Sequence, residues 1–183
     1  MPSRSRPGKP RGKALRTLTL SGLLLGVLVA QEYALLGIPN VQLTVALLLI
    51  YAAVLPWGVL VPLTIAYVLL DNWIMGSLNI VYFVPMLAAW LLLVTVGKWL
   101  NKGPRWAMVL WATAFGFVYG WFFAIPQTFL LHVNLWAYLA ADFPFEVIMA
   151  ATNFASVAFL HPPLTSLLHS LLGRPGRETI LPE

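Results

Sequence analysis

The chain has 183 residues, of which 60% are hydrophobic and only 9% are charged, and a water-soluble domain rarely has this composition. Its net charge of +5 does not indicate nucleic-acid binding, because the basic residues gather in short stretches that flank apolar runs, as membrane topology requires. The sequence contains no cysteine, which excludes disulfides, thiolate metal sites and cysteine nucleophiles.

The N-terminal part of the chain predicts a tail followed by a first membrane span. Residues 1–14 are basic and poor in apolar side chains, so we expect a disordered cytoplasmic tail. The apolar run 15–36 is long enough to cross a bilayer and continues past the length of a signal-peptide core, so it predicts an uncleaved span. The sequence Gly-Ile-Pro-Asn at 37–40 predicts the turn that ends it.

The next apolar run, 41–70, has two possible interpretations. It forms either one long tilted helix or two short helices that fold back at Pro56, Trp57 and Gly58. Three further apolar runs follow, at 80–97, 106–131 and 143–160.

The basic residues decide between the two interpretations. With two helices in 41–70, every basic stretch of the chain faces the same side of the membrane, which the positive-inside tendency favours. With one helix, Lys98, Lys102 and Arg105 would face outward. The sequence therefore predicts an all-α integral membrane protein: six transmembrane helices in a compact helical bundle over 15–172, with both termini in the cytoplasm and a C-terminal tail at 173–183.

Small residues recur at four-residue spacing on two of the predicted helices. They are Gly22, Gly26 and Ala30 on the first, and Ala112, Gly116, Gly120 and Ala124 on the fifth. This spacing places each set on one face, where another helix backbone can approach closely. Packing within the bundle and docking of a partner protein both explain such a stripe.

Polar and aromatic residues concentrate in the half of the bundle predicted to face outward. The candidate ligand-binding residues are Asn79, Tyr82, Trp90, Gln127, Glu146 and Asn153. Together they could stack a flat ligand on aromatic rings and recognise its polar edge with amides and a carboxylate. Interfacial aromatic belts and hydrogen bonds between helices are the alternative explanation.

Signatures of catalysis are missing from the sequence. No phosphate-binding loop occurs, and His132, His161 and His169 lie far apart without the spacing of a metal site. We therefore expect no enzyme, no cofactor and no metal site.

Four segments of the sequence, taken in their order and spacing, resemble the substrate-binding S component of an energy-coupling factor transporter. They are 37–43 (GIPNVQL), 115–126 (FGFVYGWFFAIP), 137–145 (AYLAADFPF) and 153–158 (NFASVA), in a six-span chain whose first helix carries a small-residue stripe. The resemblance covers nearly the whole membrane part.

The resemblance implies a function and a set of partners. An S component captures a vitamin or related micronutrient near the outer face of a prokaryotic cell membrane. A transmembrane coupling subunit and two cytoplasmic ATPase subunits drive its uptake. The family's small-residue motif contacts the coupling subunit, and Gly22, Gly26 and Ala30 match it, with glycine where alanine is common.

A different class of protein remains as an alternative. Rod-shape membrane scaffolds are also small and six-spanning, but they bind no ligand, so they need no outward pocket. The polar face of Glu146 and Asn153 distinguishes the two, because a scaffold has little reason to keep it buried. An intramembrane enzyme is disfavoured, since no paired carboxylates or nucleophile and base spacing occur.

Overall fold

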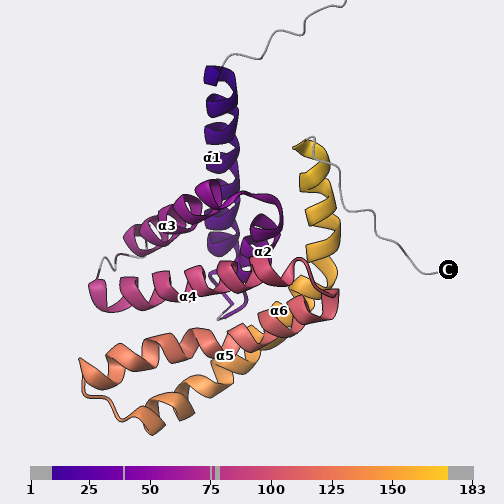
Figure 1. Ribbon diagram of the computed structural model, residues 1–183. Coiled ribbons are helices and arrows are strands. Elements are labelled where there is room, and N and C mark those ends of the chain that lie inside the picture. Colours follow the sequence, from indigo (N-terminus) through magenta and orange to yellow (C-terminus); the bar gives the residue numbers. More distant parts are fainter. Residues whose placement is uncertain (1–9, 39, 75, 77–78, 173–183) are drawn as a thin grey trace, which may run out of the picture.

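The computed structural model describes residues 10–38, 40–74, 76 and 79–172, and this part of the chain is all α-helical (Figure 1). Its six helices are α1 (Pro10–Leu35), α2 (Thr44–Val54), α3 (Trp57–Ile74), α4 (Ile80–Leu100), α5 (Arg105–Phe129) and α6 (Leu135–Leu171). The prediction that the run 41–70 forms two helices is confirmed, because α2 ends before Pro56 and α3 begins after it. A proline cannot donate the backbone hydrogen bond that would continue α2.

Five of the six helices are long and apolar enough to cross a membrane. The exception is α2, whose 11 residues rise only about 16 Å, against a hydrocarbon core of about 30 Å. The structure thus gives a helical membrane protein with five candidate spans and one short apolar helix.

The short helix α2 lies at the centre of the bundle, in contact with α1, α3, α4 and α6. Nearly all of its residues are buried. Neighbouring helices supply polar groups at both of its ends: the Gln31 side chain accepts a hydrogen bond from the Leu43 amide (2.8 Å), and Lys98 Nζ donates to the carbonyls of Ala52 (2.9 Å) and Leu55 (2.5 Å). A cation at a helix C-terminus also interacts favourably with the helix dipole.

Helices α5 and α6 run side by side as an antiparallel hairpin (Figure 1). Gly116 allows the close approach, because a Cβ there would lie only 2.6 Å from the backbone nitrogen of Ala150. Asn153 of α6 donates to the carbonyl of Ala112 on α5 (3.1 Å). The small-residue stripe on α5 therefore packs within the bundle, as the first of its two explanations predicted.

Large apolar side chains cover the surface of the bundle, as lipid contact requires. Tryptophans are exposed at both ends of the helices: Trp99 and Trp106 near the turn between α4 and α5, and Trp73 and Trp136 near the opposite ends. This distribution is typical of the aromatic belts at the two faces of a membrane.

Both the first and the last helix differ in extent from the prediction. The first helix begins at Pro10, inside the stretch expected to be a tail, and the last is Leu135–Leu171, longer at both ends than the predicted run 143–160. The last helix also contains Pro162 and Pro163, and its C-terminal part turns away from α5 (Figure 1). The predicted tail before residue 10 and the predicted tail at 173–183 lie outside the described residues.

Candidate functional site

The first turns of α6 carry three polar side chains on one face. Asn134 sets the start of this helix, since its side-chain oxygen accepts a hydrogen bond from the Ala137 amide (3.1 Å). Tyr138, Asp142 and Glu146 then follow at four-residue spacing, which places them one above another.

Helix α5 presents a glycine to this face. A Cβ at Gly120 would lie 2.5 Å from Asp142 Oδ2 and would contact Glu146 Oε1 even more closely. Both carboxyl groups thus lie directly against the α5 backbone, in space that only glycine leaves open. Two like charges held side by side repel each other unless a proton or a cation comes between them.

These carboxyl groups line a cavity of about 230 Å³, which we call the carboxylate cavity. Its walls are formed by Asn40, Gly116, Tyr119, Gly120, Phe123, Tyr138, Asp142, Phe145, Glu146 and Met149. Asn40, from the turn between α1 and α2, has a positive φ of 57°, a backbone conformation that asparagine tolerates better than most residues. The volume lies below the range of about 300–1,000 Å³ that is usual for drug-sized ligands, so the cavity suits a small molecule.

Glu146 is the most unusual group in the carboxylate cavity. The residue is only 5% exposed, and its Oε1 has no hydrogen-bond partner among the described residues. A buried carboxyl group without a partner is costly, and such groups are normally paired, protonated or bound to a ligand. Glu146 therefore identifies this cavity as the candidate binding site.

A second polar cluster joins α1, α2 and α3. Tyr67 donates a hydrogen bond to Glu32 Oε2 (2.5 Å) and lies 3.4 Å from the Thr44 hydroxyl, which accepts from Gln31 (2.7 Å). The Asp71 carboxyl group lies within hydrogen-bonding reach of Glu32. This cluster forms a second pair of neighbouring carboxyl groups, beside that of Asp142 and Glu146. The expectation from the sequence that carboxyl groups are not paired is therefore wrong.

The half-buried ring of Tyr119 connects the two carboxyl pairs. It lines the carboxylate cavity and also lies within electrostatic range of Glu32 and Asp71. All four acidic residues of the described segments thus surround one end of the bundle. Lys98 and Arg105, by contrast, lie at the other end of the bundle, on either side of the turn between α4 and α5.

The structure places the six predicted ligand-binding residues at several levels. Glu146 lines the carboxylate cavity. Trp90 is fully buried behind it, with its ring centroid 5.0 Å from that of Tyr119, and its indole nitrogen has no partner within the described part of the chain. The half-buried Tyr82 lies close enough to Tyr138 to interact with it electrostatically.

The other three predicted residues are not among those that line the carboxylate cavity. Asn79 caps the start of α4 by accepting a hydrogen bond from the Val81 amide (3.0 Å). Gln127 is half-buried near the end of α5. Asn153 is fully buried, where its side chain bonds α5 as described above, although its Oδ1 has no partner in the segments that the structure covers.

Sequence reasoning missed Tyr119, Tyr138 and Asp142 as cavity residues. Tyr138 and Asp142 precede Glu146 at four-residue spacing, but the predicted span begins at residue 143 and therefore leaves both of them out. The N-cap signal of Asn134 is the feature that could have extended the helix to include them.

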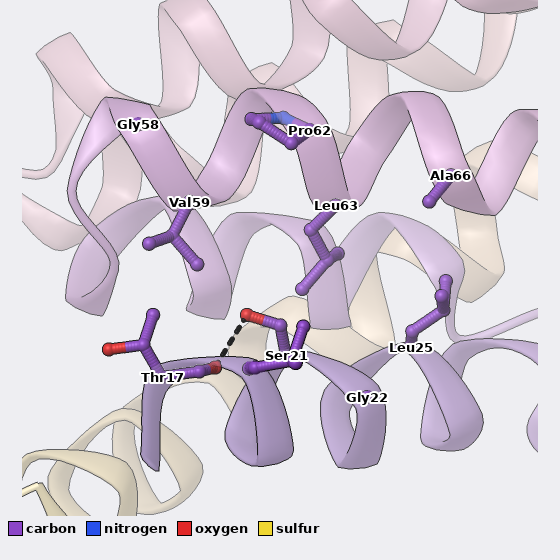
Figure 2. A pocket seen from close by; sticks show the side chains of 10 residues that line it. Thr17, Ser21, Gly22, Leu25, Gly58, Val59, Pro62, Leu63 and Ala66 are labelled. Atoms are coloured by element: carbon purple, nitrogen blue, oxygen red, sulfur yellow. Dashed lines mark hydrogen bonds between the residues drawn. The ribbon is translucent and has the colours of Figure 1, made fainter. Parts of the chain in front are cut away.

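The small-residue stripe on α1 lies on the surface of the bundle. Gly22, Gly26 and Ala30 are exposed, and a Cβ at either glycine would meet no described atom within 4 Å. Beside the stripe, α1 and α3 enclose a groove of about 660 Å³, which Figure 2 shows from close by. Leu25 of α1 and Leu63 of α3 line it from the two sides (Figure 2). The Ser21 hydroxyl donates to the Thr17 carbonyl of its own helix (2.9 Å) rather than pointing into the groove as a free polar group. The groove is therefore mostly apolar.

In the described segments, no three side chains of His, Asp or Glu come together as a metal site would require. Comparison with protein-family models, curated proteins and solved structures gives no match to this chain. Five long apolar helices and a surface of large apolar side chains nevertheless define its class: the chain is a multi-pass helical membrane protein.

Proposed function

We propose that this protein is the substrate-binding S component of an energy-coupling factor importer in a prokaryotic plasma membrane, where it captures a small micronutrient in the carboxylate cavity. The observation that carries this proposal is the buried residue Glu146, which lines the cavity and whose Oε1 has no partner among the described side chains. A binding site has a use for such a group, whereas a packing interface does not. In this proposal the chain catalyses no reaction.

The proposed topology has six spans with both termini in the cytoplasm, and the carboxylate cavity then opens toward the outside. Because α2 is short, either the bilayer must be thinner around it or the loops next to α2 must span the rest of the bilayer thickness. Since the sequence contains no cysteine, single cysteines report cleanly on sidedness. We expect Asn134→Cys to react with a membrane-impermeant maleimide in intact cells and Lys102→Cys to react only after lysis. Labelling of Lys102→Cys from outside would contradict this topology.

Uptake requires a coupling subunit and two ATPase subunits, and we place their dock on the exposed α1 stripe and the groove beside it. In lipid, helices associate through close backbone packing, so a bulky side chain on a docking face removes many contacts at once. Gly26→Leu should still fold and bind ligand, because the glycine has open space around it, but it should lose co-purification with the coupling subunit.

The matched control is Val27→Leu, which adds bulk at the next position of α1, where the side chain is already exposed. This variant should keep the complex intact. Equal co-purification of Gly26→Leu and Val27→Leu would contradict docking on the stripe.

A ligand-free scaffold of the rod-shape type is the competing function. It predicts that the purified protein carries no small molecule and that Glu146→Gln improves stability without any other effect. Native mass spectrometry of the protein extracted from its own host membrane distinguishes the two, because an S component should retain a small molecule that Glu146→Gln releases.

A further inference from the structure

We infer that the carboxylate cavity binds a small organic cation, whose charge is carried by an ammonium, amidinium or ring-nitrogen group that meets Asp142 and Glu146. This substrate class deepens the proposed function and rests on it.

The charge distribution favours a cation. Asp142 and Glu146 press their carboxyl groups against the same glycine of α5, and Glu32 and Asp71 form the second pair on the far side of Tyr119. No basic side chain is among the described residues that line the cavity. A cation between the first two carboxyl groups replaces their repulsion by two attractions, and an anion would add to the repulsion.

The burial of Glu146 points to a ligand independently of the charge count. At 5% exposure this residue has lost most of its water, and Oε1 finds no replacement donor in the described segments. A charged N–H donor from a ligand that pairs with this carboxyl group gives a hydrogen bond of the strongest kind. A neutral ligand would leave the adjacent Asp142 charge uncompensated.

The aromatic walls favour an organic cation over a metal ion. Tyr119, Phe123, Tyr138 and Phe145 all line the cavity. Faces of aromatic rings attract a diffuse cation through their quadrupoles and also bury its carbon skeleton. A hard metal ion gains little from such walls and prefers more oxygen ligands. The volume of about 230 Å³ limits the ligand to a small molecule.

Three benzene derivatives of nearly equal shape test this inference: benzamidinium (cationic), benzamide (neutral) and benzoate (anionic). Each is added at millimolar concentration to the full-length protein in nanodiscs, and the unfolding temperature is measured. Benzamidinium should raise it, while benzamide and benzoate should leave it unchanged. Glu146→Gln should weaken benzamidinium binding by at least about tenfold, the loss expected for one charge-assisted contact.

Glu183→Gln is the matched control, because it removes the same charge in the C-terminal segment and should bind benzamidinium as the wild type does. If Glu146→Gln does not fold, Asp142→Asn carries the same expectation. Equal stabilisation by benzamide, unchanged binding in the folded variants, or stabilisation by Co²⁺ but not by benzamidinium would overturn the inference. Because the assay uses the isolated chain, its failure is separate from a failure of the importer proposal, which the co-purification of Gly26→Leu tests.

Discussion

Substituting Gly116 by alanine tests the close contact between the backbones of α5 and α6. The new Cβ would lie 2.6 Å from the backbone nitrogen of Ala150 and 2.7 Å from its Cα. Nonbonded carbon atoms normally stay about 3.5–4.0 Å apart, so α5 and α6 must separate locally by about 1 Å. Both partners are backbone atoms and cannot rotate away. Overpacking of this kind costs about 1–3 kcal/mol.

The same substitution at Gly22 provides the matched control. Alanine there meets no described atom within 4 Å, so it gains the intrinsic helix preference over glycine without the clash. The difference in unfolding free energy between the two variants isolates the clash, and we expect Gly116→Ala to be less stable by about 1–3 kcal/mol. Reversible unfolding in mixed SDS micelles, followed by circular dichroism, measures it. Equal stability of the two variants would refute the close packing of α5 on α6.

Three further substitutions probe polar contacts by the same unfolding assay. Tyr67→Phe removes the hydroxyl that donates to Glu32 and should lower the free energy of unfolding by about 1–3 kcal/mol. An unchanged stability would mean that this carboxyl group does not need its donor. Lys98→Met keeps the aliphatic stem but loses the bonds to the carbonyls of Ala52 and Leu55 at the C-terminal end of α2. We expect this to lower the free energy of unfolding by about 1.5–3 kcal/mol, of which Lys98→Arg should recover part. Asn153→Leu removes the hydrogen bond to the Ala112 carbonyl and should lower the free energy of unfolding by about 1 kcal/mol. It should leave benzamidinium affinity unchanged, and a weaker affinity would place Asn153 in the site.

Much of the helix arrangement could be predicted from composition and charge. The break at Pro56 follows from two independent signals, the proline itself and the need to keep every basic stretch on one side. The packing of the α5 stripe follows from the spacing of its small residues. The sequence could not distinguish it from the α1 stripe, however, because an inward and an outward stripe have the same composition and spacing.

The candidate site could be predicted only in part. Glu146 was predicted because a carboxyl group within a span requires a reason. The pairing of Glu32 with Asp71 depends on α1 lying beside α3, a contact between residues far apart in the sequence that no local pattern encodes. Trp90 is predicted to contact the ligand, and the structure buries it behind Tyr119. The spacing of residues along α4 shows which of them share a face, but it does not show which neighbouring helix covers that face.

The polar groups at the two ends of α2 bear on how the chain is made. Gln31 has already left the ribosome when α2 emerges, but Lys98 follows Leu55 by 43 residues. A largely apolar helix of only 11 residues is too short to insert into lipid as a span by itself. We therefore expect α2 to reach its place only after α4 has been inserted. A nascent chain arrested after α3 should leave α2 open to protease, and one arrested after α4 should protect it.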